Sequence, residues 1–294
     1  VGVDNIDMDA ATRLGTAVIN APAGNTVAVA ELFFGAVISL LRGLARADAS
    51  MHQGRWDRSA LLGSELKGRT LGIVGLGRIG SEVAHRAHAF GMGVVAYDPY
   101  VTAERFAALR VRRALSLSAL LEEVDLLTVH TPLTDETRGM IGAGELSKLR
   151  KGAVVVNMAR GGIVDDAALL VALEGGRLGG AVLDVYVKEP LIGEHRFRGR
   201  ADVLLSPHIG ASTREAQRNV AVDVCAAVRD ALLEGDLSRS LNAALDADVS
   251  ALQSAILLAR RAAVVARALL AEGGASSIAS VTLKTGDDLT PAAG

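Results

Sequence analysis

The 294-residue chain contains little cysteine, few aromatic side chains and little net charge. Cys225 is its single cysteine, which excludes an internal disulfide and a cysteine-ligated metal cluster and is typical of a reducing compartment, so we expect the cytoplasm. Only 3% of the residues are aromatic although 50% are hydrophobic, so the core must consist mainly of Ala, Val, Leu and Ile. The formal net charge of −2 provides no basic footprint for nucleic acid. These absences favour a small-molecule ligand.

A long uninterrupted hydrophobic run is also absent. The most apolar segment near the start, Val27–Leu41, contains Glu31 and Ser39 and falls short of the about 20 residues that cross a bilayer. We therefore expect a buried helix there and no membrane partner. The chain begins with Val, and residues 1–20 read as the end of a strand, a helix and a second strand, so we expect a fragment that lacks its natural N-terminus.

From residue 70 onward, short β-branched runs alternate with amphipathic stretches of helical period. Six strands are predicted, at Thr70–Val74, Gly93–Tyr97, Asp125–Val129, Ala153–Asn157, Ala181–Val185 and Asp202–Leu205. Helices are predicted between them, among them Ile79–Phe90, Leu117–Glu123 and Asp166–Glu174. This alternation predicts an α/β fold with a doubly wound parallel sheet, in which the loops that follow the strands lie at one edge and bind the ligand.

The stretch "TLGIVGLGRIG" places Gly75, Gly77 and Gly80 directly after a predicted strand and at the start of a predicted helix. In this context the spacing is typical of a dinucleotide site, where glycines allow a tight turn, close approach to a pyrophosphate and close helix packing. Asp98 ends the next strand, where a carboxylate can accept hydrogen bonds from ribose hydroxyls and repel a 2′-phosphate. The pattern favours NAD over NADP; the alternative is a glycine turn beside a solvated aspartate.

Three ionisable residues at predicted strand ends could carry chemistry. His208, in "LLSPHIG", can take a hydroxyl proton, Arg160, in "NMARGGIVDD", can bind a carboxylate through two N–H groups, and Glu189, in "LDVYVKEP", can pair with the imidazolium. Each also has an ordinary explanation, with Arg160 and Glu189 as a structural ion pair and His208 as a cap. No metal site is predicted, because His85 and His88 share a helix without a third ligand in view.

At these residues the sequence resembles the D-isomer-specific 2-hydroxyacid dehydrogenases. The resemblance runs over about residues 1–236, through "GVDNID", "GNTVAVAEL", "GRTLGIVGLGRIG", "VHTPLTDETRGMIG", "NMARGGIVDDAAL", "LDVYVKEP" and "PHIGASTREAQ". It implies that Arg160, Glu189 and His208 are the catalytic residues. It also implies that Arg78, Ile79, Asp98, Thr131, Ala159 and Asp184 contact the cofactor, with Asp184 on the nicotinamide carboxamide, and that Asn25 lies near the substrate.

The resemblance further implies a division of the chain into domains. Residues 21–211 would form the NAD-binding Rossmann domain, and residues 1–20, completed by a returning helix at 212–236, would be the remnant of a flavodoxin-like substrate domain. Residues 237–294 look like the start of a C-terminal α+β domain, an intervening or regulatory domain found in long members of the family. Homodimers or homotetramers are expected, with a contact through the Val27–Leu41 helix.

The activity implied by the resemblance is NAD-dependent oxidation of a D-2-hydroxy acid. The C-terminal segment favours D-3-phosphoglycerate, oxidised to 3-phosphohydroxypyruvate at the entry to serine biosynthesis. Two alternatives remain: a glyoxylate or hydroxypyruvate reductase with the same chemistry, and a non-catalytic NAD-sensing regulator.

Overall fold

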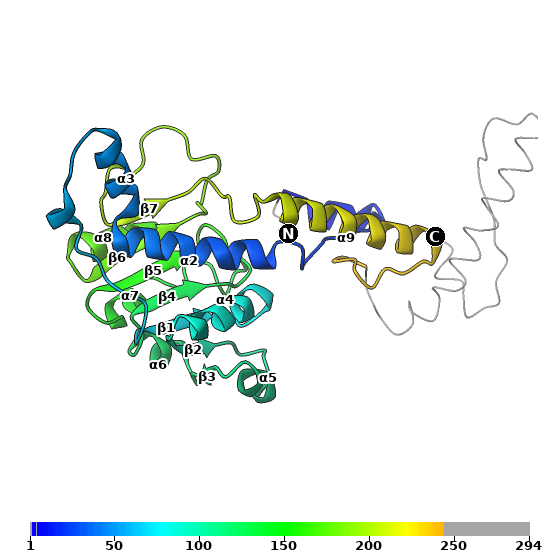
Figure 1. The fold of residues 1–294 in the computed structure, drawn as a ribbon. Coiled ribbons are helices and arrows are strands. Elements are labelled where there is room, and N and C mark those ends of the chain that lie inside the picture. Colours follow the sequence, from blue (N-terminus) through cyan, green and yellow to red (C-terminus); the bar gives the residue numbers. More distant parts are fainter. Residues whose placement is uncertain (1, 4, 244–294) are drawn as a thin grey trace, which may run out of the picture. The chain divides into compact units, whose positions relative to one another are not determined.

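The computed structural model describes residues 2–3 and 5–243 (Figure 1). One compact unit is Asn25–Gln217, and the described residues of 1–24 and of 218 onward form a second unit. Most of the segment predicted to begin a C-terminal domain, 237–294, lies outside the described residues.

The larger unit is built on a seven-stranded parallel sheet of order β3-β2-β1-β4-β5-β6-β7. Its strands are β1 (Thr70–Val74), β2 (Gly93–Tyr97), β3 (Arg112–Arg113), β4 (Leu126–Val129), β5 (Ala153–Asn157), β6 (Leu178–Leu183) and β7 (Val203–Leu205). The chain winds outward from β1 in one direction and from β4 in the other, so the predicted doubly wound sheet is confirmed.

The helices follow the strands as the sequence pattern requires. They are α1 (Met8–Arg13), α2 (Thr26–Arg42), α3 (Leu44–His52), the 3₁₀ turn η1 (Arg58–Leu61), α4 (Arg78–Ala89), α5 (Ala103–Ala108), α6 (Leu117–Leu121), α7 (Ala143–Lys148), α8 (Asp166–Glu174) and α9 (Arg214–Leu233). No single helix of the described residues is long and apolar enough to cross a membrane; α2 and α3 reach that length only as a pair bent by 65°.

The strand register places six strand ends in one row. Paired Cα atoms run across the sheet through Tyr97, Val74, Val129, Asn157, Leu183 and Leu205. The residues that follow them in the chain therefore leave the sheet at the same edge. Among these are Asp98, Gly75, His130 and Asp184.

Two hydrophobic clusters cover the two faces of the sheet, because side chains of successive strand residues point to opposite faces. On one face, Leu71 and Ile73 of β1 pack with α2 and α4. On the other, Val74 of the same strand packs with residues of α6, α7 and α8. The segment Val27–Leu41 forms most of α2, whose Val29, Ala30, Phe33, Phe34, Ala36 and Val37 are buried, so the predicted buried helix is confirmed.

Strands β3 and β6 differ most from the prediction, while β4 and β7 each begin one residue later than predicted, at Leu126 and Val203, and β6 ends at Leu183 instead of Val185. The two-residue β3 was missed because both of its arginines are exposed, so it has no apolar pattern. Strand β6 begins at Leu178, three residues before the predicted start, because Gly179 and Gly180 read as a turn. A Cβ atom at Gly179 would lie 2.5 Å from the carbonyl oxygen of Gly152, so glycine here allows close approach of two backbones.

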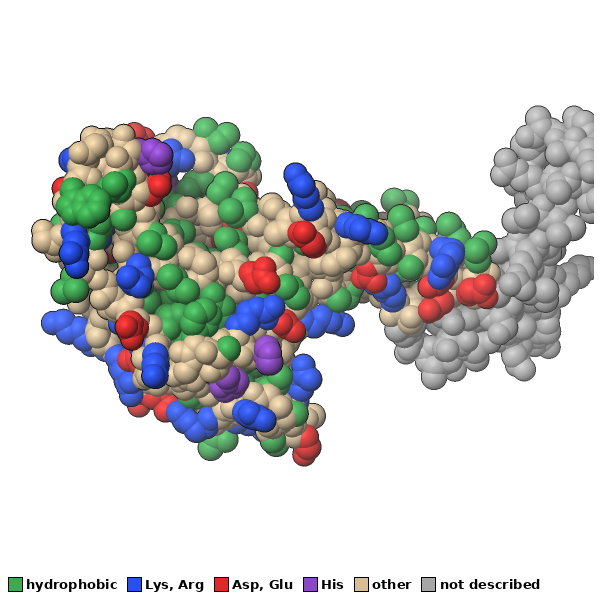
Figure 2. All heavy atoms as spheres, in the orientation of Figure 1, with side chains coloured by type: hydrophobic (Ala, Val, Ile, Leu, Met, Phe, Trp, Pro, Cys, Tyr) green, Lys and Arg blue, Asp and Glu red, His purple; other side chains and the backbone are tan. Residues whose placement is uncertain are grey.

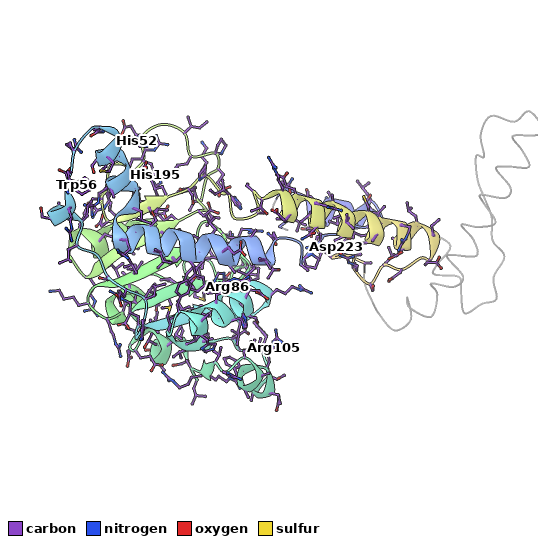
Figure 3. All side chains as sticks on the ribbon, viewed as in Figure 1. His52, Trp56, Arg86, Arg105, His195 and Asp223 are labelled. Atoms are coloured by element: carbon purple, nitrogen blue, oxygen red, sulfur yellow. The ribbon has the colours of Figure 1, made fainter. Side chains whose placement is uncertain are left out.

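The smaller unit joins the beginning of the chain to its later part. Ile19 and Ser240 form an isolated antiparallel bridge, and the Val18 N–H donates to Asn242 Oδ1 at 2.8 Å. Arg239 forms an ion pair at 2.6 Å with Asp223. Asp223 lies on α9 (Figure 3). In residues 1–20 the sequence predicted a helix followed by a strand. The helix is present as α1, but in place of the strand there is only the bridge at Ile19.

His130 carries a buried imidazole at the end of β4. Its Nε2 lies 3.1 Å from Thr128 Oγ1, and among the described residues its buried Nδ1 has no hydrogen-bond partner. Burial lowers the pKa of His130 from 6.5 to about 4. The imidazole therefore stays neutral in the folded protein at pH values where the unfolded chain takes up a proton.

This difference predicts acid lability. Stability is unaffected by His130 above pH 6.5 and falls as the pH drops toward 4, because only the unfolded chain binds the proton. At pH 5 the loss relative to pH 7 should be about 2 kcal/mol. Urea unfolding at the two pH values measures it, with His130→Gln as the variant that cannot titrate. Equal losses in the two proteins would contradict the assignment.

Candidate active site

The turn after β1 is shaped by three glycines with different surroundings. Gly75 has φ +93°, and its N–H donates to the Tyr97 carbonyl oxygen at 3.0 Å. A Cβ atom at Gly80 would lie 2.2 Å from the Gly75 carbonyl oxygen, so α4 can approach the turn only without a side chain there. At Gly77 no heavy atom would lie within 4 Å of a Cβ. The backbone is thus open at the start of α4, where a helix N-terminus attracts an anion.

Asp98 is held in place by the neighbouring backbone. Its Oδ2 accepts from the Leu76 N–H at 2.8 Å and its Oδ1 from the Tyr100 N–H at 2.9 Å. Each carboxylate oxygen keeps a further lone pair, so the half-buried group can still accept from two adjacent hydroxyls. The carboxylate is therefore fixed beside the glycine turn, as the sequence predicted for a ribose-binding residue.

The remaining predicted cofactor residues lie along the same edge. Arg78 is exposed in the first turn of α4, whereas Ile79 is partly buried against the core. Thr131 and Ala159 are half-buried after β4 and β5. The Thr131 Oγ1 atom is buried without a hydrogen-bond partner among the described residues, as expected for a hydroxyl that a cofactor would satisfy. The residues present therefore fit a dinucleotide.

The turn that carries Arg160 is tied by Asn157. The Asn157 Nδ2 donates to the Arg160 carbonyl oxygen at 2.8 Å, and its Oδ1 accepts from the Ala159 N–H at 3.1 Å. The Arg160 Nη1 donates to the Ala159 carbonyl oxygen at 2.7 Å. A Cβ atom at Gly161 would lie 2.0 Å from the carbonyl carbon and oxygen of Tyr186, so this turn packs tightly on the loop after β6.

Glu189 and His208 meet directly. The His208 Nδ1 lies 2.6 Å from Glu189 Oε2, and the other oxygen, Oε1, accepts from the Tyr186 N–H at 2.9 Å. The two side chains are 34% and 47% exposed, so a ligand can reach them. His208 has φ +53°, an unfavourable conformation for a residue with a Cβ that must be held by its surroundings. The structure thus brings together two of the three predicted catalytic residues.

A cavity of about 620 Å³ adjoins this pair. It is lined by Tyr186, Glu189, Pro190, Leu191, Arg198, Leu205, Ser206, Pro207 and His208. Burial raises the pKa of Tyr186 to about 12, so its hydroxyl keeps its proton at neutral pH. That hydroxyl lies 2.9 Å from the Ser206 carbonyl oxygen and 3.1 Å from that of Leu183, and the tyrosine thereby attaches the His208 loop to β6.

The last two predicted site residues are Asp184, which is buried beneath the loop that carries His208, and Asn25, which precedes α2. Asp184 is 1% exposed and accepts hydrogen bonds from Ser206, Ile209 and Gly210. Asn25 precedes α2, and its side chain forms no capping hydrogen bond. One turn further on, Val29 lies within 3.2 Å of where a Gly210 Cβ would stand, so the start of α2 packs on the His208 loop.

Sequence reasoning missed the residues that hold the predicted ones. Asn157, Tyr186 and Ser206 make the hydrogen bonds that orient the turns around Arg160, Glu189 and His208. Asn157 left a signal, because an amide ending an apolar strand marks a turn. Tyr186 and Ser206 left none, since the hydrogen bonds that join Tyr186 to Ser206 and Ser206 to Asp184 span 20 and 22 residues. Within the described residues no group of three or more His, Cys, Asp or Glu side chains could hold a metal ion.

Comparison with known proteins supports this description. Residues 34–210 match the family model described as D-isomer specific 2-hydroxyacid dehydrogenase, NAD binding domain. The D-3-phosphoglycerate dehydrogenase of Bacillus subtilis (strain 168) is 51% identical over 224 residues, which are 76% of this chain and 42% of the relative. The rat enzyme of the same name is 45% identical over 245 residues, 82% of this chain and 45% of the relative. The chain thus spans less than half the length of these relatives.

Solved structures agree with the fold. A glyoxylate reductase from Paecilomyes thermophila has a TM-score of 0.76 and 36% identity, covering 82% of this chain and 73% of that one. A D-lactate dehydrogenase from Aquifex aeolicus, complexed with NAD and lactic acid, has a TM-score of 0.73 and 30% identity, covering 82% of this chain and 78% of that one. NAD, the predicted cofactor, is confirmed. The chain belongs to the D-isomer specific 2-hydroxyacid dehydrogenase family.

Proposed function

We propose that the protein oxidises D-3-phosphoglycerate to 3-phosphohydroxypyruvate with NAD, the entry step of serine biosynthesis. The observation that carries the chemistry is the 2.6 Å contact between His208 Nδ1 and Glu189 Oε2 beside a dinucleotide-binding turn. The choice of acid is supported by the names of the relatives at 45% to 51% identity. Residues 1–24 and α9 are proposed to belong to the substrate domain, and the segment after 236 to a further domain.

The geometry gives each side chain a part in this reaction. With Glu189 accepting the Nδ1–H, the lone pair of the imidazole is on Nε2, which can take the proton of the substrate hydroxyl. The carboxylate of Glu189 then stabilises the imidazolium that results. Arg160, fixed by the Asn157 turn, orients the substrate through its carboxylate or carbonyl oxygen. NAD, when bound, supplies the acceptor for the hydride from C2.

The dinucleotide would be held by the residues of the same edge. The open backbone at Gly77 would receive the pyrophosphate, and the Asp98 carboxylate would accept from the ribose hydroxyls. Thr131 would find a partner for its buried hydroxyl. Arg78, Ile79 and Ala159 would complete the contacts.

A second acid remains a candidate, because a glyoxylate reductase is among the similar structures. Turnover by the full-length protein decides between the two acids. It is measured with D-3-phosphoglycerate, D-glycerate and D-lactate and, in the reverse direction, with glyoxylate. We expect kcat/KM for the phosphorylated acid to be higher by a factor on the order of 10², with its L-isomer as the inactive control. Equal or better turnover of unphosphorylated acids would contradict the choice. NAD binding without turnover of any acid would favour the non-catalytic regulator.

The role of His208 is tested by its removal. In the full-length protein, His208→Ala should lower kcat by a factor on the order of 10² or more, because the base is lost, and should leave the Kd for NAD unchanged. His85→Ala is the matched control, since His85 is an exposed histidine of α4. Turnover that survives in His208→Ala would show that another group takes the proton.

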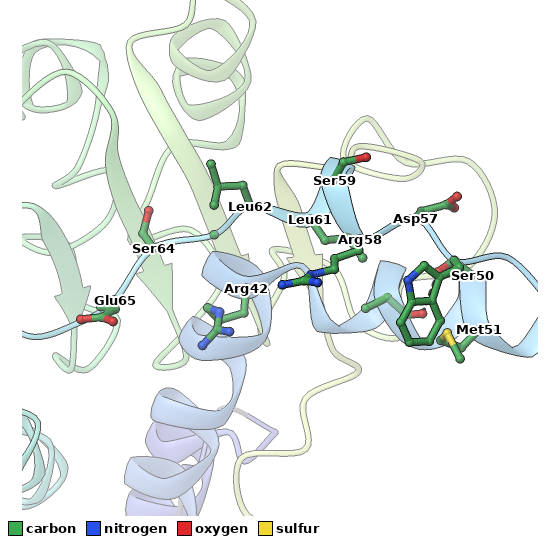
Figure 4. Close-up of a pocket in the computed structure, with 13 residues that line it drawn as sticks. Arg42, Ser50, Met51, Asp57, Arg58, Ser59, Leu61, Leu62, Ser64 and Glu65 are labelled. Atoms are coloured by element: carbon green, nitrogen blue, oxygen red, sulfur yellow. Dashed lines mark hydrogen bonds between the residues drawn. The ribbon is translucent and has the colours of Figure 1, made fainter.

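A homodimer is proposed as well, through the segment next to α2. The apolar face of α2 is used within the unit itself, whereas several large side chains after it are exposed: Leu44, Met51, Trp56 and Leu62, the last by 97%. Hydrophobic side chains reach the surface near α3 (Figure 2), and Trp56 lies in the segment between α3 and η1 (Figure 3). Met51, Trp56 and Leu62 are among the residues that line a cavity of about 990 Å³ (Figure 4).

Sedimentation of the full-length protein tests this contact. The wild type should sediment as a dimer or larger, and the double variant Trp56→Glu, Leu62→Glu should shift toward monomer while still binding NAD, because buried charge opposes association. A Val171→Glu variant, which changes an exposed apolar residue of α8, serves as the control. Association unaffected by the double variant would place the interface elsewhere.

A further inference from the structure

We infer that Asp184 is a positioning residue for the catalytic histidine, in addition to any contact with the cofactor. This inference rests on the proposed function, because it assigns His208 a part in the reaction. Asp184 follows the last residue of β6, and it is 1% exposed. Among the described residues no lysine or arginine forms an ion pair with it. A buried carboxylate without a counter-ion is costly unless hydrogen bonds compensate its charge.

The compensating donors all come from one short loop. Asp184 Oδ1 accepts from the Ser206 hydroxyl at 2.6 Å and from the Ile209 N–H at 2.9 Å. Asp184 Oδ2 accepts from the Gly210 N–H at 2.9 Å. These donors lie on both sides of His208 in the chain. One carboxylate therefore fixes the two ends of the segment that carries the imidazole.

The conformation of His208 shows why such a clamp is needed. Its φ of +53° is disfavoured for a residue with a Cβ, so the loop would relax to another conformation without contacts that hold it. The hydrogen bond to Glu189 is a side-chain contact at the exposed surface, with the imidazole 47% exposed. The buried Asp184 contacts are the ones that set the backbone from which this side chain departs.

Asp184 also connects the loop to the rest of the site. Its own N–H donates to the Asn157 carbonyl oxygen at 3.0 Å, and Asn157 ties the turn of Arg160. The loop has little room to move toward the carboxylate, because a Cβ at Gly210 would already lie 3.2 Å from both Asp184 Oδ2 and Val29. A small displacement of Asp184 would therefore move the loop that carries His208 and change the distance between His208 and Glu189. Turnover depends steeply on that distance.

Two variants of the full-length protein test the inference. Asp184→Asn replaces one acceptor by a donor that faces a backbone N–H, and Ser206→Ala removes one donor and leaves the carboxylate in place. We expect kcat to fall by about 10- to 100-fold in the first and by about threefold in the second. In both, the pH profile of kcat should be displaced. The Kd for NAD should stay within about twofold in Ser206→Ala, whereas in Asp184→Asn it reports separately on the expected contact of Asp184 with the cofactor. Urea unfolding checks that each variant folds.

Asp165→Asn is the matched control. Asp165 also accepts a backbone hydrogen bond, from the Ala168 N–H at 2.7 Å, but it caps α8 and does not contact the His208 loop. This variant should keep the kcat and the pH profile of the wild type.

A proton NMR signal gives a readout that does not depend on turnover. The hydrogen-bonded Nδ1–H of His208 should resonate far downfield in the wild type, be identified by its loss in His208→Ala, and weaken or shift in both positioning variants. If no hydroxy acid is oxidised by the wild type, the proposed function fails while this signal still reports on the clamp. An unchanged signal and pH profile in Asp184→Asn, with or without a weaker affinity for NAD, would overturn the inference.

Discussion

The parallel register of the sheet is the constraint on which the site depends. Six strands end in one row of paired residues, from Tyr97 through Val74, Val129, Asn157 and Leu183 to Leu205. Because all strands run parallel, the loop that follows each of them leaves the sheet at the same edge. Along that edge the proposed cofactor residues follow β2, β1 and β4, and the proposed acid–base pair, Glu189 and His208, follows β6 and β7. A shift of register by one residue would break this row.

Backbone hydrogen bonds to side chains do most of the positioning at this edge. The N–H groups of Leu76 and Tyr100 orient the Asp98 carboxylate. The Asn157 side chain holds the turn of Arg160, and the Glu189 carboxylate accepts from the Tyr186 N–H. These contacts join neighbouring strand ends, so the cofactor half and the chemical half of the site are continuous. The glycines serve the same purpose, because Gly80 and Gly161 allow backbones to approach where a Cβ would collide. Rigid loops of this kind place charged groups without reorganisation during the reaction.

The sequence predicted the parts of this structure that local pattern encodes. β-branched runs and amphipathic stretches identified every strand except β3, whose two exposed arginines carry no apolar signal. The start of β6 was misplaced because Gly179 is a packing glycine and not a turn. The polar residues at strand ends were found from their position alone. What local pattern could not supply is long-range pairing. The contact of Asp184 with residues 206–210 spans more than 20 positions. The imidazole of His130 likewise packs edge-on against Phe33 of α2, a residue far from it in the sequence.

A crystal structure of the full-length protein with NAD and D-3-phosphoglycerate would show whether both ligands bind at this edge of the sheet. We expect the pyrophosphate over Gly77, the ribose hydroxyls on Asp98, the carboxylate of the acid on Arg160 and its hydroxyl on His208 Nε2. A dinucleotide bound away from this edge, or an acid that does not contact Arg160 and His208, would contradict it.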